Sequence, residues 1–384
     1  MRPLIAILGF AWAATCVAAE PSCSYRAGAA TIDLPGAPFA AEPSADGCWL
    51  YVSLGHGRSP GRGAVAVLHN DEGAFVMRRA VPLDGDPAGL GLTQDGGRLL
   101  VADGAGISIL DVARLQAGDA DPLLGRIPLG VGTIYLAITR DDRTVFASVE
   151  REARIAVIDL ARVGDRAPGA EAVIGSIPAG TAPVGLALSR KGDRLYATSE
   201  SAPRSLGLEA RCLLDGGRYG DRRLSEGLLS VIDVARARVD PAAAILATWR
   251  AGCSPVRVIL GPDDKVAWVS ARGEDAVYRF DLGSNGSPGA TATLRRFAVG
   301  SAPVGLALAP SGDALWISNS NRFSRSEPGT LERIDLLDGS RTVLPSGRFP
   351  RDLRFLPDGR TLVVAVFGSS QLQLVPPPPR EPAR

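Results

Sequence analysis

Three large polar residues occupy one position of a segment that recurs along the chain. Where two nearly identical copies have Gly185 and Gly305, other copies have Tyr135, Arg257 and Asp352. In a narrow, partly desolvated opening, an arginine can hold a carboxylate or a similar anion through charge-assisted hydrogen bonds. The three residues are therefore predicted to line a ligand-binding site. The alternative is that Asp352 only neutralises Arg257, in which case the pair is structural.

Other polar residues are expected near this site. Arg351 flanks Asp352 in the sequence, and His56 lies in a glycine-rich loop that covers residues 55–62. Both are predicted as neighbours of the ligand, His56 against the simpler interpretation of an exposed loop histidine. Further charged and aromatic residues expected at the same opening are Glu150, Arg151, Glu152, Arg154, Arg322, Phe323 and Arg325. The alternative for all of them is a solvated rim of hydrated ion pairs.

The composition argues against several kinds of chemistry. There are only two histidines, His56 and His69, and no Cys-x-x-Cys, so no metal site and no cofactor are predicted. No Gly-x-Ser-x-Gly motif supports a serine hydrolase triad. The formal net charge is +1, which gives no sequence-wide attraction to nucleic acid. Acid–base chemistry by Asp or Glu stays open, although turns account for most carboxylates.

The elements that must position these residues follow from the repeat. The segment 182–188 returns at 302–308, and weaker copies begin at Pro87, Thr133, Pro255, Pro350 and Pro38. An Asp/Gly turn follows each copy, at steps of about 45 to 52 residues with one step of about 71. This period predicts an all-β propeller whose blades have four strands each. The polar residues then lie at the upper end of the inner strands, where the central channel opens.

The chain provides seven inner strands but only six complete blades. The last blade ends its third strand at residues 371–375 and then runs into prolines, which cannot pair inside a sheet. Residues 29–34 are predicted to supply the missing outer strand. The fold prediction is a seven-bladed β-propeller whose ring is closed by an N-terminal strand, which removes an exposed sheet edge.

The Pro-Val-Gly-Leu-Ala-Leu, Asp-Gly, Leu-Tyr-Ala-Thr and Val-Ile-Asp elements resemble those of the YVTN-repeat family of bacterial propellers, which includes YncE-like proteins. The resemblance covers essentially the whole mature chain and implies the fold. It is weak for function, because the motif encodes blade geometry. The family includes proteins without an assigned reaction and relatives of amine-dehydrogenase large subunits and lactonases, so function must be argued from the site.

Four cysteines remain once a leader is removed: Cys23, Cys48, Cys212 and Cys253. An even number in an exported chain favours disulfides, with three possible pairings. In a propeller, Cys48 and Cys23 both lie at the lower face, whereas Cys253 and Cys212 lie in upper connections. The propeller therefore predicts Cys23–Cys48 and Cys212–Cys253, against the alternative of free buried thiols.

The ends of the chain and one insertion stand apart from the repeat. Residues 1–19 resemble a signal peptide, with Arg2, an apolar run and a small-residue cleavage site before Glu20. The mature protein is then expected in the periplasm or outside the cell, without a transmembrane segment. The propeller is predicted over 20–375, with an insertion at 201–227 in the fourth blade and a disordered, proline-rich tail at 376–384. Long loops of this kind are often functional or disordered.

Two functions from different classes follow. The first is a binding scaffold whose upper face receives a small ligand or a periplasmic protein, without catalysis of its own. The resemblance implies a link to a quinoprotein or cytochrome redox system. The second is a lactonase-like or other hydrolytic enzyme with carboxylates and arginines at the channel mouth. A subunit of an amine dehydrogenase is a third interpretation, which requires a companion chain that carries the cofactor.

Overall fold

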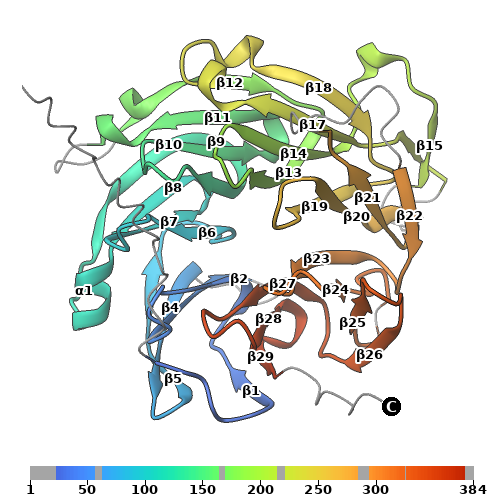
Figure 1. The fold of residues 1–384 in the computed structure, drawn as a ribbon. Coiled ribbons are helices and arrows are strands. Elements are labelled where there is room, and N and C mark those ends of the chain that lie inside the picture. Colours follow the sequence, from blue (N-terminus) through green and yellow to red (C-terminus); the bar gives the residue numbers. More distant parts are fainter. Residues whose placement is uncertain are drawn as a thin grey trace, which may run out of the picture.

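The computed structural model describes residues 23–56, 63–163, 169–213, 221–283, 294–324 and 326–376. Antiparallel sheets stand around a central channel in the manner of a β-propeller (Figure 1). The innermost strands contact one another in the order β2, β6, β9, β13, β19, β23, β27 and back to β2. We call the channel upper where these strands begin and lower where they end.

Most sheets consist of four strands that follow one another along the chain, as the sequence predicts. They are β2 (Ala37–Pro43), β3 (Trp49–Gly55), β4 (Gly63–Asp71) and β5 (Ala74–Leu83); β13 (Thr181–Leu188), β14 (Arg194–Ser201), β17 (Leu228–Asp233) and β18 (Ile245–Arg250); β19 (Pro255–Leu260), β20 (Val266–Ala271), β21 (Ala276–Asp281) and β22 (Leu294–Ala298); and β23 (Pro303–Leu308), β24 (Ala314–Asn319), β25 (Thr330–Asp335) and β26 (Arg341–Pro345).

One sheet has seven strands because a long strand, β9 (Leu123–Ile138), belongs to two neighbouring four-strand units. Its first part pairs with β8 and its second part pairs with β10. The other strands are β6 (Leu90–Leu92), β7 (Arg98–Ala102), β8 (Gly104–Asp111), β10 (Thr144–Val149), β11 (Arg154–Asp159) and β12 (Val173–Pro178).

The two ends of the described chain share a sheet. Strand β1 (Ala30–Asp33) pairs antiparallel with β29 (Gln371–Val375), with Ile32 opposite Leu372. Strands β28 (Leu362–Val366) and β27 (Pro350–Phe355) complete this sheet toward the channel. In Figure 1, β1 lies beside β29 at the outer end of this sheet. The N-terminal strand therefore covers an edge that β29 would otherwise expose.

Helices are short in the described residues. They are α1 (Val112–Ala117), α2 (Val234–Ala237) and the 3-10 turns η1 (Glu150–Glu152), η2 (Leu160–Arg162), η3 (Ala170–Ala172), η4 (Arg204–Leu206), η6 (Pro241–Ala243), η7 (Arg272–Glu274) and η8 (Phe367–Ser369). Asp111 and Asp233, which end third strands, cap α1 and α2 through their carboxylates. These Asp residues therefore begin the short helices that follow the two third strands.

A hydroxyl residue in the second strand joins neighbouring sheets around the channel. Most of the inner strands have a register shift near their beginning, where backbone N–H groups do not bond to the neighbouring strand. A side chain must then accept the hydrogen bonds of these N–H groups. The Ser270 hydroxyl accepts from the backbone N–H of Arg257 at 3.1 Å and donates to the carbonyl of Val304, in the next sheet, at 2.8 Å. Ser148 and Thr198 make the same two bonds in their own sheets.

The disulfides Cys23–Cys48 and Cys212–Cys253 are both present, which confirms the predicted pairing. The first joins the segment before β1 to the turn before β3. The second joins a small hairpin, β15 (Ala210–Leu213) and β16 (Arg223–Ser225), to the loop that leads into β19. This hairpin lies in the predicted insertion, where the sequence shows no strand alternation. Two disulfides are typical of proteins from an extracellular or periplasmic compartment.

Candidate functional site

Tyr135, Arg257 and Asp352 meet across the channel. The Arg257 guanidinium donates a hydrogen bond to the Tyr135 hydroxyl at 2.6 Å and forms an ion pair with the Asp352 carboxylate. The same guanidinium lies over the Tyr135 ring, 4.2 Å from its centroid. The side chains of Arg257 and Asp352 are only 12% and 8% exposed. The three residues therefore form a buried polar bridge between β9, β19 and β27, which we call the channel bridge.

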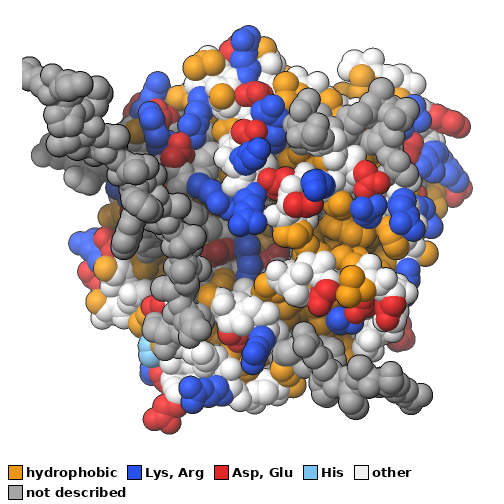
Figure 2. Space-filling model, viewed as in Figure 1, with side chains coloured by type: hydrophobic (Ala, Val, Ile, Leu, Met, Phe, Trp, Pro, Cys, Tyr) orange, Lys and Arg blue, Asp and Glu red, His pale blue; other side chains and the backbone are white. Residues whose placement is uncertain are grey.

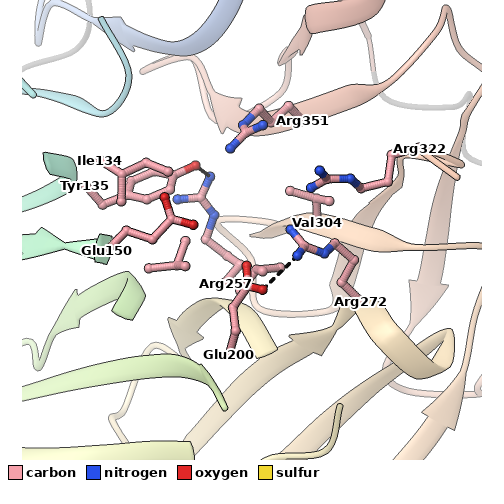
Figure 3. Close-up of a pocket in the computed structure, with 11 residues that line it drawn as sticks. Ile134, Tyr135, Glu150, Glu200, Arg257, Arg272, Val304, Arg322 and Arg351 are labelled. Carbon is pink, nitrogen blue, oxygen red and sulfur yellow. Dashed lines mark hydrogen bonds and ion pairs between the residues drawn. The ribbon is translucent and has the colours of Figure 1, made fainter. Parts of the chain in front are cut away.

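A cavity of about 310 Å³ lies above the channel bridge (Figure 3). In Figure 3, Tyr135 and Glu150 lie on one side of Arg257, and Arg322 and Arg272 lie on the other. Four arginines and two glutamates contribute to the wall, so positive charge is in excess. The lining residues are Ile134, Tyr135, Glu150, Val184, Glu200, Val256, Arg257, Arg272, Val304, Arg322 and Arg351. Blue basic side chains also lie near the middle of the face shown in Figure 2.

Arg351 is a cation of this wall that lies against three aromatic rings. Its guanidinium lies 3.7 Å from the centroid of Phe39, and Phe349 and Phe367 are 5.5 and 5.7 Å away. Burial lowers the pKa of Arg351, and its contact with the Tyr135 hydroxyl acts in the opposite direction. Its Nε atom is buried without a hydrogen bond, and no carboxylate in the described ranges forms an ion pair with it. The charge of Arg351 is therefore available to a bound anion.

The two glutamates of the wall differ in their partners. Glu200 forms an ion pair of 2.8 Å with Arg272, whose side chain is 9% exposed. Burial raises the pKa of Glu150 above its ordinary value, and the neighbouring Glu200 adds to this effect, whereas Arg351 and Arg272 oppose it. Glu150 is thus a carboxyl that gains a proton more readily than a free glutamate. It can act as a hydrogen-bond donor or as a general acid.

Not every residue expected from the sequence reaches this cavity. His56 is not among the lining residues, and its backbone N–H donates to the Asp86 carboxylate at 2.9 Å. Glu152 and Arg154 form an ion pair of 2.8 Å with each other. Arg151 and Phe323 do not line the cavity either, although the Arg322 guanidinium lies 5.9 Å from the Phe323 ring. Arg325 lies outside the described residues, as does the part of the His56 loop at 57–62.

Glu200 and Arg272 were not predicted, although the repeat contains a signal for them. Both lie two residues after the hydroxyl residue that joins neighbouring sheets, Thr198 and Ser270 respectively. Glu150 stands at the same offset from Ser148. Alignment of the second strands would therefore have identified Glu150, Glu200 and Arg272 as three charged residues at one position of the channel mouth.

The described residues contain neither a cluster of metal ligands nor a helix that could span a membrane. Among the residues with described positions, no group of three or more His, Cys, Asp or Glu side chains could hold a metal ion. The helices within the same ranges are all too short, or too polar, to cross a membrane.

Comparison with solved structures places the fold among known β-propellers. The chain is similar to hydrazine synthase of Kuenenia stuttgartiensis, with 18% identity, a TM-score of 0.67 and coverage of 90% of this chain and 96% of that chain. It is also similar to the β-propeller domain of Swd1 from Myceliophteria thermophila, with 13% identity, a TM-score of 0.64 and coverage of 90% and 99%. The periplasmic gluconolactonase of Pseudomonas aeruginosa has 20% identity, a TM-score of 0.62 and coverage of 83% and 88%.

At these identities the similarity extends to the fold alone, which is a β-propeller. No protein-family model matches the chain. No curated protein sequence matches it. Function must therefore be argued from the cavity and its charges.

Proposed function

We propose that this chain is a binding propeller whose upper cavity receives a small, hydrophilic organic anion such as a carboxylate. The observation that carries the proposal is Arg351, a half-buried side chain whose guanidinium lies against three aromatic rings and has no carboxylate partner among the described residues. An arginine held in this way is preorganised, so little conformational entropy is lost when it binds a carboxylate.

The surroundings of Arg351 favour an anion over a cation. Arg257 and Arg272 are each matched by a carboxylate, Asp352 and Glu200. Arg351 lies close enough to Glu150 to oppose the rise of its pKa, and a carboxyl with a raised pKa neutralises a neighbouring cation less completely than an ordinary glutamate. The low dielectric of a partly closed cavity strengthens the remaining attraction for a negative charge. A volume of about 310 Å³ suits a small molecule, and not a polypeptide segment.

Calorimetric titration with gluconate, succinate and citrate tests this proposal, with glucose and succinamide as neutral counterparts. We expect at least one of the anions to bind saturably and its neutral counterpart to bind far more weakly. Arg351→Ala should weaken that anion by about tenfold or more, the value of a charge-assisted hydrogen bond. Arg351→Lys should recover only part of the loss, because an ammonium lacks the planar fork of a guanidinium.

Arg360→Ala is the matched control, because Arg360 is an exposed arginine outside the cavity. The proposal fails if no anion of the panel binds better than its neutral counterpart. It also fails if Arg351→Ala binds the anion as tightly as Arg360→Ala does.

We propose in addition that the chain is an exported, seven-bladed member of the YVTN-repeat group. Counting the long strand β9 in two blades gives seven, and the pairing of β1 with β29 supports closure by the N-terminal strand. The domain boundaries are proposed as a signal peptide at 1–19, a propeller at 20–375 with the insertion 201–227, and a tail at 376–384. Mass spectrometry of the exported protein should find a mature chain that begins near Glu20. A periplasmic redox protein is the partner class that the resemblance adds.

A second candidate is a lactonase-like or other hydrolytic activity in the same cavity. The observation in its favour is Glu150, a carboxyl with a raised pKa beside Arg351. Such a group can give a proton to a leaving alcohol while an arginine stabilises the oxyanion. A panel of lactones and esters, assayed with and without a chelator, tests this. The enzyme hypothesis requires turnover that falls sharply in Glu150→Gln, whereas the binding hypothesis requires none.

A further inference from the structure

Below the channel bridge lies a second cavity of about 470 Å³, larger than the upper one. The channel bridge forms its roof, because Tyr135, Arg257 and Asp352 all contribute to its wall. The remaining lining residues are Ala40, Gly89, Leu90, Leu136, Arg140, Leu186, Ala187, Leu188, Arg190, Val258, Ile259, Leu260, Gly261, Pro262, Asp264, Leu306, Leu353 and Arg354. The function proposed above does not use this space.

Many of the side chains in the wall of the lower cavity are apolar. Leucine, isoleucine, valine and alanine side chains from β9, β13, β19, β23 and β27 surround it. Directly below the channel bridge, two residues farther along each inner strand, β13 has Ala187 and β19 has Ile259. Two charged side chains interrupt this apolar set. Arg354 forms an ion pair of 2.8 Å with Glu42, and the Asp264 carboxylate, near the mouth, accepts from the backbone N–H of Arg190 at 2.7 Å. A ligand in this cavity would therefore contact these apolar side chains together with polar atoms of the roof and the mouth.

The lower mouth has two arginines where the repeat has prolines. Arg140 and Arg190 each stand two residues after the end of an inner strand, the position of Pro262, Pro310 and Pro357 in other copies. Both are exposed, and neither guanidinium forms an ion pair with a carboxylate in the described part of the chain. Among the described residues, the acceptor for the Arg190 guanidinium is the carbonyl of Pro262, at 3.2 Å.

The roof, in contrast, offers no charge to a ligand. The Arg257 guanidinium already serves the Asp352 carboxylate and the Tyr135 hydroxyl. A charged group of a ligand that contacts this roof would have to break the buried ion pair of Arg257 and Asp352, which is unfavourable in free energy. A ligand with one charged end would therefore direct that end toward the mouth.

We propose that the lower cavity is a second binding site, for an anion with an apolar body. The apolar body lies against the leucine and alanine wall, and the anionic group lies at the mouth between Arg140 and Arg190. A volume of about 470 Å³ falls in the ordinary range for small-molecule sites. This site is independent of the anion proposed for the upper cavity, because the channel bridge separates the two spaces.

Calorimetric titration with octanoate tests the proposal, with acetate and octanamide as probes that each lack one feature. We expect one octanoate to bind per chain and both comparison probes to bind at least about tenfold more weakly, since each loses either the charged hydrogen bonds or the apolar contact. The double variant Arg140→Ala/Arg190→Ala should weaken octanoate by about tenfold or more. Both positions are exposed, so the variant should fold normally.

Two controls distinguish the lower cavity from octanoate binding elsewhere on the protein. Arg143→Ala/Arg360→Ala removes two exposed arginines from lower turns outside the cavity and should leave octanoate binding unchanged. Arg351→Ala, which alters the upper cavity, should also leave it unchanged. If Arg351→Ala abolishes octanoate binding and the Arg140/Arg190 variant does not, the anion lies in the upper cavity and the proposal is wrong. The absence of saturable octanoate binding by the unmodified protein would also overturn it.

Discussion

Substitution of Asp352, which removes the ion pair with Arg257, provides the sharpest test of whether the channel bridge stabilises the fold. Both side chains are almost completely buried, so removal of one partner leaves the other charge without compensation. Breaking a buried pair in this way costs about 3–5 kcal/mol of stability. Asp352→Asn should cost about 3 kcal/mol, at the lower end, because Arg257 keeps the Tyr135 hydroxyl at 2.6 Å and the face of its ring.

The double variant Arg257→Met/Asp352→Leu removes both charges and keeps much of the volume. Replacement of a buried pair by apolar residues is often close to neutral. We therefore expect the double variant to be more stable than Arg257→Met alone or Asp352→Leu alone. The coupling energy from this cycle should be about 2–3 kcal/mol. Urea denaturation measures each free energy of unfolding. A loss of about 3 kcal/mol also corresponds to a fall of about 6 °C in Tm, at roughly 2 °C per kcal/mol for a large domain.

The exposed pair Arg236–Asp240 is the matched control, with side chains 53% and 46% exposed. Asp240→Asn should cost less than about 0.5 kcal/mol, as solvent screens such pairs. If Asp352→Asn costs no more than Asp240→Asn, the channel bridge is not structural and the argument from burial is wrong. The same variant also affects binding. Asp352→Asn frees Arg257 to face the upper cavity, so the anion identified there should bind more tightly.

Three further predictions concern pH, packing and the insertion. The folded protein raises the pKa of Glu150 from 4.5, so ionisation of this carboxyl lowers the stability as the pH rises through the raised value. Thermal melts across this pH range should show a fall in Tm that Glu150→Gln lacks. The affinity for the anion should rise as the pH falls through the same value. Gly305→Ala would place a Cβ 2.5 Å from the Arg351 carbonyl oxygen, so urea denaturation should show a loss of about 1–3 kcal/mol, absent in the open turn variant Gly339→Asn. Replacement of Cys212 and Cys253 by serine should cost about 2–4 kcal/mol by the same measurement, and equal stability in both proteins would show that the hairpin is held without this bond.

The β-propeller fold and the disulfides were predictable because they depend on regular features of the sequence. The copies of the Pro-Val-Gly-Leu-Ala-Leu segment define the inner strands, and these place Cys23 beside Cys48. The channel bridge was predicted as a set of residues, since Tyr135, Arg257 and Asp352 depart from the repeat at one position. The sequence did not decide whether these residues bind a ligand or whether Asp352 only neutralises Arg257. Strand periodicity does not define the direction of side chains across a channel.

The aromatic bed of Arg351 could not be predicted from the repeat. Phe39 lies in β2, Phe349 precedes β27 and Phe367 begins η8, and these positions do not correspond to one another in the repeat. Their convergence depends on contact between the first and last inner strands. His56 shows the opposite limit: it directly follows β3, and it does not line the upper cavity.

From β6 to β27 the inner strands alternate between glycine and a large polar residue at one position, where β2 has Ala40, and this alternation explains how the channel bridge forms. Gly89, Gly185 and Gly305 each precede, around the ring, a strand that carries Tyr135, Arg257 or Asp352. A Cβ at Gly185 would lie 2.5 Å from the carbonyl oxygen of Val256, so the glycine lets the strand with Arg257 approach closely. Large residues on adjacent strands would crowd one sector of the channel, whereas large residues on alternate strands can meet across it. The same spacing closes the channel at one level only, which leaves a cavity on each side of Arg257.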